Sequence, residues 1–323
     1  MKALDRKLAA ILAGTYTPDD FLIADAKDAD MAWGLAAVGP AAGGGLRTRP
    51  EYLSDMAELV RQGELDIILC SASNGERLAG DGVLDDSDVT LAVRANDTTD
   101  IWSARGSGYA RRPSRPFRSA DLELVRPFCD LVLYSITLNN DLEHDLATLE
   151  GYARFRREAR EHGVRHFLEV FNPNAPRDLA PEQVGAFVND SIVRALAGVT
   201  AVERPLFLKV AYNGPAALEE LTGHDPSLVV GVLGGSAGTT RDAFELLRAA
   251  ERHGARVALF GRRIQRAQSQ QDLVALMRPV LRGDLTPADA VREYHRHLAA
   301  RGLTPHRILD DDLQITEPVL RQG

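Results

Sequence analysis

Eight short segments of the chain are almost continuously apolar. In them Val, Ile, Leu, Phe and Ala follow one another instead of alternating with polar residues, which is typical of strands that are buried on both faces. The pattern predicts strands at residues 21–25, 65–71, 89–96, 131–138, 166–172, 206–212, 228–233 and 256–261.

Helical patterns separate most of these strands. Apolar residues at helical spacing predict helices at residues 51–61, 141–162, 181–196, 215–221, 240–253 and 271–281, whereas the helices after the second and third strands are poorly defined. Gly163 and Gly254 each stand between a helical pattern and the next strand, where a C-cap glycine is expected. Strands and helices that alternate over eight units predict an α/β protein with a (β/α)₈ TIM barrel, formed by about residues 20–282.

The two ends of the chain extend beyond this barrel. An amphipathic segment predicts an N-terminal helix at about residues 3–13. Thr286-Pro287 resembles a capped start of a further helix, at about residues 287–301, within a C-terminal helical extension of residues 283–323. Because no linker divides the sequence, we expect residues 1–323 to form a single TIM-barrel domain.

The composition excludes some classes of protein. With 45% hydrophobic and 26% charged residues, the chain has the composition of an ordinary globular protein. Its net charge of -8 argues against a general nucleic-acid binder. No signal-peptide pattern is present, and no apolar run approaches the roughly 20 residues that span a bilayer. We therefore expect a soluble, cytoplasmic protein with neither a nucleic-acid nor a membrane partner.

Cysteine and histidine point to neither redox nor metal chemistry. Cys70 and Cys129 each end an apolar segment and are interpreted as buried free thiols. The eight histidines lack the spacing of a metal site, so we expect no metal and no cofactor. A Mg²⁺ ion bound by the carboxylates of Asp25, Asp28 or Asp97 is the alternative.

Lysine is the most informative residue type. The chain has four lysines and 34 arginines, and two of the lysines, Lys27 and Lys209, follow or interrupt an apolar strand. Arginine stays protonated, whereas a desolvated lysine can lose its proton and attack a carbonyl group. Burial within the strand at 206–212 would lower the pKa of Lys209. We predict Lys209 as a nucleophile that forms an imine with a ketone, with a structural salt bridge as the alternative.

Acidic residues accompany both internal lysines. Glu169 lies in the preceding strand, flanked by apolar residues, and therefore needs a partner such as Lys209. Either the two form a buried ion pair, or Glu169 transfers protons while a C–C bond breaks. At the end of the first strand we predict catalytic roles for Asp25, Lys27 and Asp28, where Lys27 either lowers the pKa of Lys209 or pairs with an aspartate.

Small residues follow the last two strands. Gly234-Gly235-Ser236 follows one and Gly261-Arg262 the other. In TIM barrels these loops commonly bind phosphate, because small residues let backbone N–H groups approach an oxyanion. We predict a phosphate site there, with tight structural turns as the alternative. Arg94 and Tyr134 are further predicted substrate contacts on the same face of the barrel.

Two connections at this face are long. Residues 26–50 contain a glycine-rich stretch, and residues 97–126 are rich in arginine, with Arg105, Arg111, Arg112, Arg115 and Arg118. Long loops at the C-terminal face often act as lids or as subunit contacts. The arginines either are solvated, contact another subunit of a homo-oligomer, or recognise an anionic substrate group.

These residues resemble those of the class I, Schiff-base aldolases of the tagatose-bisphosphate, fructose-bisphosphate and deoxyribose-phosphate type. The resemblance extends over about residues 20–282 and is carried by four motifs: Leu208-Lys209-Val210, Leu168-Glu169, Ser236-Ala-Gly238 and Gly261-Arg262. It implies an imine on Lys209 and a phosphorylated substrate. The acid that the family carries on its first strand corresponds to Lys27 or Asp28.

The sequence thus predicts a class I aldolase, a lyase that cleaves or forms a C–C bond of a keto substrate. The substrate is expected to be a phosphorylated sugar, and no cofactor is required. A metal- or base-dependent isomerase or epimerase on the same barrel is one alternative. A non-catalytic barrel that binds a phosphate ligand is the other.

Overall fold

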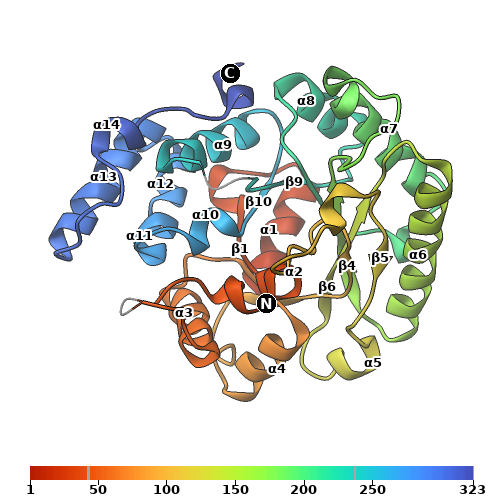
Figure 1. Cartoon of the computed structure of the whole chain (residues 1–323), viewed down its shortest axis with the longest axis horizontal. Coiled ribbons are helices and arrows are strands. Elements are labelled where there is room, and N and C mark those ends of the chain that lie inside the picture. The colour runs from red at the N-terminus through yellow and green to blue at the C-terminus, as the bar shows by residue number, and fades with distance from the viewer. Residues whose placement is uncertain (42–43, 236–237, 323) are drawn as a thin grey trace.

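Eight parallel strands close into a barrel in the computed structural model, which describes residues 1–41, 44–235 and 238–322 (Figure 1). The strands run in the order β1-β10-β9-β8-β7-β6-β3-β2. Each barrel strand is therefore paired with the barrel strands before and after it in the sequence, and β10 closes the ring by pairing with β1. Their bounds are Leu22–Lys27 (β1), Ile67–Cys70 (β2), Thr90–Arg94 (β3), Leu131–Thr137 (β6), Arg165–Phe171 (β7), Leu208–Val210 (β8), Val230–Leu233 (β9) and Val257–Phe260 (β10). The predicted TIM-barrel fold and its eight strands are confirmed.

Helices surround this ring of strands (Figure 1). Six follow the strands in turn: α3 (Arg49–Gln62), α4 (Ala72–Gly80), α6 (Leu142–Glu161), α7 (Val184–Leu196), α8 (Pro215–His224) and α9 (Thr240–Arg252). The helix after the third strand, α5, is a single turn at Leu122–Val125. The two helices that are poorly defined in the sequence, α4 and α5, are the shortest of these seven.

One predicted helix is divided in two. The sequence predicts a continuous helix at residues 271–281, but the structure has α11 (Gln270–Ala275) and α12 (Met277–Arg282), which follow the short α10 (Arg262–Gln265). Pro279 has no amide hydrogen for the carbonyl group of Ala275, and its ring would clash with that carbonyl in a regular helix. The prediction of one helix was wrong for this reason.

Both ends of the chain pack against the barrel. At the start, α1 (Ala3–Leu12) places Leu4 and Leu8 in the apolar cluster inside the barrel. At the end, α13 (Pro287–Ala300) packs on α9 and on the short α14 (Leu309–Asp312) (Figure 1). None of the helices in the described residues is long and apolar enough to span a bilayer. The single domain over residues 1–323 stays a prediction.

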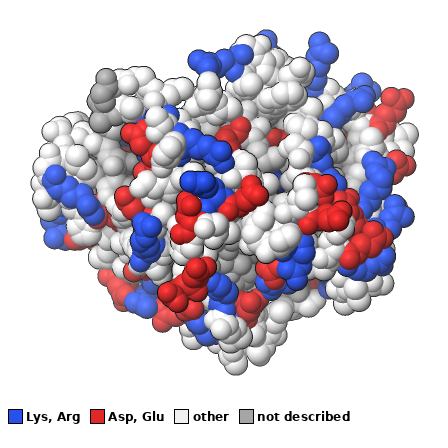
Figure 2. Space-filling view, turned by 90° about the horizontal axis from the view of Figure 1, so that it is seen from below, with Lys and Arg blue, Asp and Glu red and all other residues white. Residues whose placement is uncertain are grey.

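Charged side chains of both signs are interspersed over the face drawn in Figure 2. Neither sign forms a continuous surface among the residues coloured there. This distribution agrees with the modest net charge of -8 in the whole chain.

Side chains alternate between the inside of the barrel and the layer under the helices. On β1, for example, Leu22, Ala24 and Ala26 belong to the inner cluster, whereas Ile23 belongs to the outer one. This alternation follows from the two-residue repeat of a strand. It decides which polar residues near the ends of the strands can reach a common site.

Replacing Gly231 by alanine tests how tightly the barrel strands pack. Gly231 lies opposite Lys209 in the pairing of β8 with β9, and an added Cβ would lie 2.7 Å from Val257 Cβ and 2.9 Å from the Leu208 carbonyl oxygen. We expect Gly231→Ala to reduce the free energy of unfolding by about 1–3 kcal/mol because of overpacking, measured by urea denaturation. Gly198→Ala is the matched control, since nothing lies within 4 Å of its added Cβ. Equal stability of the two variants would contradict this account.

Candidate active site

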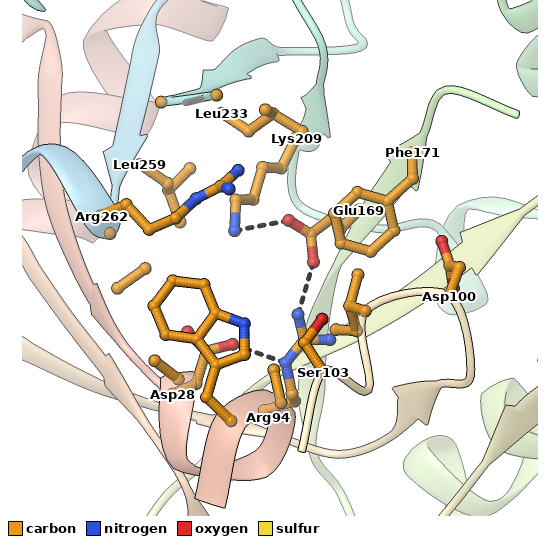
Figure 3. Close-up of a pocket in the computed structure, with 18 residues that line it drawn as sticks. Asp28, Arg94, Asp100, Ser103, Glu169, Phe171, Lys209, Leu233, Leu259 and Arg262 are labelled. Carbon is orange, nitrogen blue, oxygen red and sulfur yellow. Dashed lines mark hydrogen bonds and ion pairs between the residues drawn. The ribbon is translucent and has the colours of Figure 1, made fainter. Parts of the chain in front are cut away.

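A pocket of about 280 Å³ opens at the C-terminal ends of the barrel strands (Figure 3). This is the face of a TIM barrel where active sites are found. The pocket brings together most of the predicted site residues, which come from β1, β3, β7, β8 and the loops after β9 and β10: Asp28, Arg94, Glu169, Lys209, Gly234, Gly235, Gly261 and Arg262.

Lys209 and Glu169 form an ion pair in this pocket. Their side chains come from adjacent strands in register, and the Lys209 Nζ lies 2.6 Å from the Glu169 Oε1. Both residues are buried, with exposed fractions of 5% and 1%. They face the inside of the barrel because Phe167 and Phe207, two residues earlier on each strand, stack against each other there.

Arg94 joins this pair to Asp28. Its Nη2 donates to the Glu169 Oε2 at 2.8 Å, and its Nε donates to the Asp28 Oδ2 at 2.5 Å. Its Nη1 donates to the Ser135 Oγ at 2.7 Å. Arg94 thus holds two carboxylates in place, and because it also lines the pocket, its predicted contact with substrate stays a prediction. We call Lys209, Glu169, Arg94 and Asp28 the ion-pair chain.

The charge of Asp28 is stabilised by this arrangement. Burial raises the pKa of its carboxyl group, but Arg94 and then Lys209 lower it, and the net result is a pKa below the ordinary value of 3.8. Asp28 is therefore ionised at neutral pH. An ionised carboxylate beside an amine can accept a proton from a bound molecule.

Small residues shape one side of the pocket. Gly235 has a φ of +63°, a conformation that favours glycine. An added Cβ on Gly261 would lie 2.9 Å from the carbonyl oxygen of Ala26, so a larger residue does not fit there. Arg262 follows Gly261, and its guanidinium lies 6.0 Å from the ring of Trp33. The predicted phosphate contact Ser236 lies outside the described residues.

Asp25 and Lys27 are not part of the pocket. The Lys27 Nζ lies 3.1 Å from the Asp25 Oδ2 and donates to the Gln270 Oε1 of α11 at 2.7 Å, and both charged side chains are fully buried. On β1 these two residues alternate with Ala26 and Asp28 and so point outward, under the helices. Lys27 therefore pairs with an aspartate, which was one of the two predictions for it.

Burial governs this outer pair. It raises the pKa of Asp25 to about 6 although Lys27 is near, and it lowers the pKa of Lys27 although Asp25 is near. Neither side chain can touch a molecule in the pocket. The prediction that Asp25 and Lys27 act on substrate does not fit their position.

Tyr134 also points away from the pocket. It stands between Leu133 and Ser135 on β6 and faces the helix layer, where its ring stacks on Phe155 with the ring centroids 4.3 Å apart. Burial raises the pKa of its hydroxyl group to about 12. A substrate contact by Tyr134 does not fit this position, and the reason is again the alternation of side chains along a strand.

Sequence reasoning assigned no site role to several residues that line the pocket, among them Trp33, Asp100, Ser103 and Phe171. Trp33 ends α2 (Ala29–Trp33), and Asp100 and Ser103 belong to the long connection at residues 97–126. For Trp33, Asp100 and Ser103 the only signal in the sequence was the length of their connections, whereas Phe171 follows Glu169 by two residues on its strand and therefore shares its face. Nothing in a loop's composition says which of its side chains turns inward.

The arginines of the long connection do not line this pocket in the described structure. The connection forms a small hairpin of β4 (Asp97–Thr98) and β5 (Pro116–Phe117). Arg115 and Arg118, at its end, line a separate hollow together with Arg154 of α6. Recognition of a substrate anion in the pocket by these arginines therefore has no support in their position.

Metal ligands and thiols are sparse around the site. Within residues 1–41, 44–235 and 238–322, no group of three or more His, Cys, Asp or Glu side chains is arranged to hold a metal ion. Cys70 and Cys129 are buried free thiols, as the sequence indicated.

Known proteins match this chain in structure and not in sequence. No protein-family model matches it, and no curated protein matches it. A solved structure of an archaeal fructose-1,6-bisphosphate aldolase, with its catalytic Lys bound to the carbinolamine intermediate, is 18% identical, with a TM-score of 0.62 over 87% of this chain and 100% of the other.

Two further structures give the same picture. A Schiff-base-forming fructose-1,6-bisphosphate aldolase is 16% identical, with a TM-score of 0.63 over 86% of this chain and 99% of the other. The fructose-bisphosphate aldolase from Slackia heliotrinireducens is 16% identical, with a TM-score of 0.65 over 94% of this chain and 92% of the other. At such low identity these matches establish the (β/α)₈ fold.

A double-mutant cycle tests the outer ion pair. Lys27→Met leaves Asp25 buried without its partner and should cost about 3–5 kcal/mol of unfolding free energy. Asp25→Leu should be destabilising for the same reason, whereas the double variant should cost less than the sum of the two. Urea unfolding at pH 8, where Asp25 would be ionised, measures the three variants. Strictly additive effects would contradict a coupled pair.

Replacing Arg94 tests the ion-pair chain. Arg94→Met removes the cation between Glu169 and Asp28 and should cost about 3–5 kcal/mol of unfolding free energy. Ser135→Ala, which removes a single neutral contact of Arg94, is the control and should cost about 0.5–1.5 kcal/mol. Both values come from urea denaturation at pH 7. If the two variants unfold at the same urea concentration, Arg94 does not stabilise these carboxylates.

Proposed function

We propose that this protein is a class I aldolase. In this proposal Lys209 forms a Schiff base with the carbonyl carbon of a phosphorylated keto sugar, and a C–C bond of the sugar is cleaved or formed. One observation carries the proposal: a buried lysine and glutamate, 2.6 Å apart, face a barrel pocket that has small glycine loops and an arginine on one side. This combination supplies a nucleophile, a proton acceptor and a position for phosphate.

Imine formation uses the Lys209–Glu169 pair directly. The lysine ammonium gives a proton to the Glu169 carboxylate, and the neutral amine attacks the carbonyl carbon to form a carbinolamine. Loss of water, with the hydroxyl protonated by Glu169, yields the protonated imine. This imine is a better electron acceptor than the ketone.

Cleavage then follows from the charge on the imine. A carboxylate removes the proton of the substrate hydroxyl next to the scissile bond, and the electrons of the broken O–H bond form the C=O bond of the departing aldehyde. The C–C bonding electrons move to the iminium and leave an enamine on Lys209. Protonation of the enamine carbon and hydrolysis of the imine release the second product and regenerate the amine.

Two carboxylates are available for these proton transfers. Glu169 contacts the Lys209 Nζ, and Asp28 lines the same pocket. Asp28, directly after β1, is the acid at the end of the first strand that lines the pocket, whereas Lys27 faces the helices. This supports Asp28 as the counterpart of the acid that resembling aldolases carry on their first strand.

Phosphate is assigned to the loops after β9 and β10. Gly234, Gly235 and Gly261 leave backbone groups accessible there, and Arg262 adds a cation. The fold shared with fructose-1,6-bisphosphate aldolases supports a phosphorylated sugar as substrate. A cytoplasmic location, a role in carbohydrate metabolism and assembly into a homo-oligomer belong to the same proposal.

Reductive trapping tests the chemistry. We expect borohydride, added together with a ketose phosphate, to attach the substrate to Lys209 irreversibly, as detected by peptide mass spectrometry. Lys209→Met should abolish both the label and C–C cleavage, while the control Lys2→Met, just before α1 and outside the pocket, should change neither. Glu169→Gln should lower kcat by about 10²–10⁴-fold.

Other results would identify the alternatives. A label on Lys27, or on no lysine at all, would overturn the proposal. Conversion that leaves every C–C bond intact would favour an isomerase in which Lys209 acts as a base. Ligand binding without turnover, unchanged by Lys209→Arg, would favour a non-catalytic barrel.

A further inference from the structure

The charges that line the pocket are distributed unevenly. Arg94, Lys209 and Arg262 are the cationic side chains among its described lining residues. Arg94 is occupied by Asp28 and Glu169, and Lys209 is paired with Glu169 and takes the carbonyl carbon in the proposed reaction. In the described residues, Arg262 alone of the three forms no ion pair. The pocket thus offers one uncommitted cation to an anionic substrate.

Arg262 and Asp100 lie on opposite sides of the barrel mouth. Arg262 follows β10, while the Asp100 Oδ2 accepts a hydrogen bond from the Oγ1 of Thr137, the last residue of β6, at 2.9 Å. In the closed ring, β10 and β6 are separated by β9, β8 and β7 on one side and by three strands on the other. They are therefore directly opposite each other.

Lys209 lies between these two sides. Its strand, β8, is the middle one of the three that separate β10 from β6. In Figure 3, Arg262 is on the left, Asp100 on the right, and Lys209 with Glu169 between them. A sugar that reaches Lys209 with its carbonyl and Arg262 with its phosphate therefore extends its remaining carbons toward Asp100.

Asp100 is fixed as a hydrogen-bond acceptor at this far side. Its Oδ1 accepts from the Ser114 Oγ at 2.7 Å and its Oδ2 from the Thr137 Oγ1. The lining residues next to it, Ile101, Ser103 and Phe171, are uncharged. A carboxylate in this surrounding accepts hydrogen bonds from sugar hydroxyls but repels a phosphate.

A second cation reinforces the asymmetry. Arg266 lies 5.5 Å from the ring of Trp33, the same ring that Arg262 approaches, and although it lines a neighbouring hollow instead of this pocket, its charge adds to the positive charge on the β10 side. The arginines at the end of the long connection, Arg115 and Arg118, belong to a separate hollow.

We propose that this site takes keto sugars with a single phosphate, on the carbon chain beside the carbonyl, and that the aldehyde released is uncharged and hydroxylated. The inference rests on the proposed aldolase function and names its substrate class. It separates this chain from the fructose-1,6-bisphosphate aldolases whose solved structures share its fold.

Cleavage kinetics test the inference. Ketose 1-phosphates and the corresponding 1,6-bisphosphates, in both the fructose and tagatose configurations, are compared by kcat/KM. We expect the best monophosphate to exceed its own bisphosphate by at least about 10²-fold, the effect of placing like charges together in a partly buried site. A bisphosphate that is cleaved as well as its monophosphate, or better, would overturn the inference.

Variants test whether Asp100 causes the preference for monophosphates. Asp100→Asn keeps a hydrogen-bonding side chain but removes the charge, and should reduce the monophosphate preference at least about fivefold. Asp86→Asn, at an exposed aspartate outside the pocket, is the matched control and should leave the ratio unchanged. Arg262→Met should raise KM for both substrates. Thermal melting checks that each variant is folded, and an unchanged ratio in folded Asp100→Asn would contradict the role of Asp100.

Trapping separates the two proposals. If borohydride labels Lys209 with the bisphosphate and not with the monophosphate, the aldolase proposal stands and the monophosphate inference fails. If neither class of substrate labels Lys209, the aldolase proposal fails and the inference fails with it. Labelling by the monophosphate in preference to the bisphosphate supports both.

Discussion

The need to neutralise buried charge organises this protein around the ion-pair chain. Lys209, Glu169, Arg94 and Asp28 are all buried at the mouth of the barrel, where an unpaired charge would be costly. Each carboxylate therefore contacts a cation, and the guanidinium of Arg94 suits this task because its donors point in several fixed directions. The ion-pair chain joins residues of β8, β7 and β3 to Asp28, which directly follows β1. The order of the strands therefore positions each of these four side chains.

The barrel carries a second, separate buried pair. Asp25 and Lys27 neutralise each other under the helices, one residue away in sequence from side chains that line the pocket. The two sets stay apart because neighbouring residues on a strand point to opposite faces. Lys27 and Lys209 are thus both rare lysines at apolar strands, but of the two only Lys209 lines the pocket.

Loops after the strands form the two sides of the pocket around Lys209. Glycines after β9 and β10 leave room for an anion on one side of Lys209, while the long connection brings Asp100 and Ser103 to the other side. In the proposed reaction the strands fix Lys209, and the loops determine which parts of a substrate are accepted. Such a division between a rigid barrel and variable loops is common in TIM-barrel enzymes.

The sequence by itself determined the barrel, its eight strands, and the pairing of Lys209 with Glu169. Continuous apolar runs and adjacent strands carry that information locally. Only the tertiary structure decided that Asp28 and not Lys27 faces the pocket, that Tyr134 faces the helices, and that Arg94 is occupied by carboxylates. These outcomes depend on the register of each strand, where a shift of one residue turns a side chain to the other face. The inward turn of Asp100 depends on contacts with Ser114 and Thr137, which are distant in the chain and have no local signature.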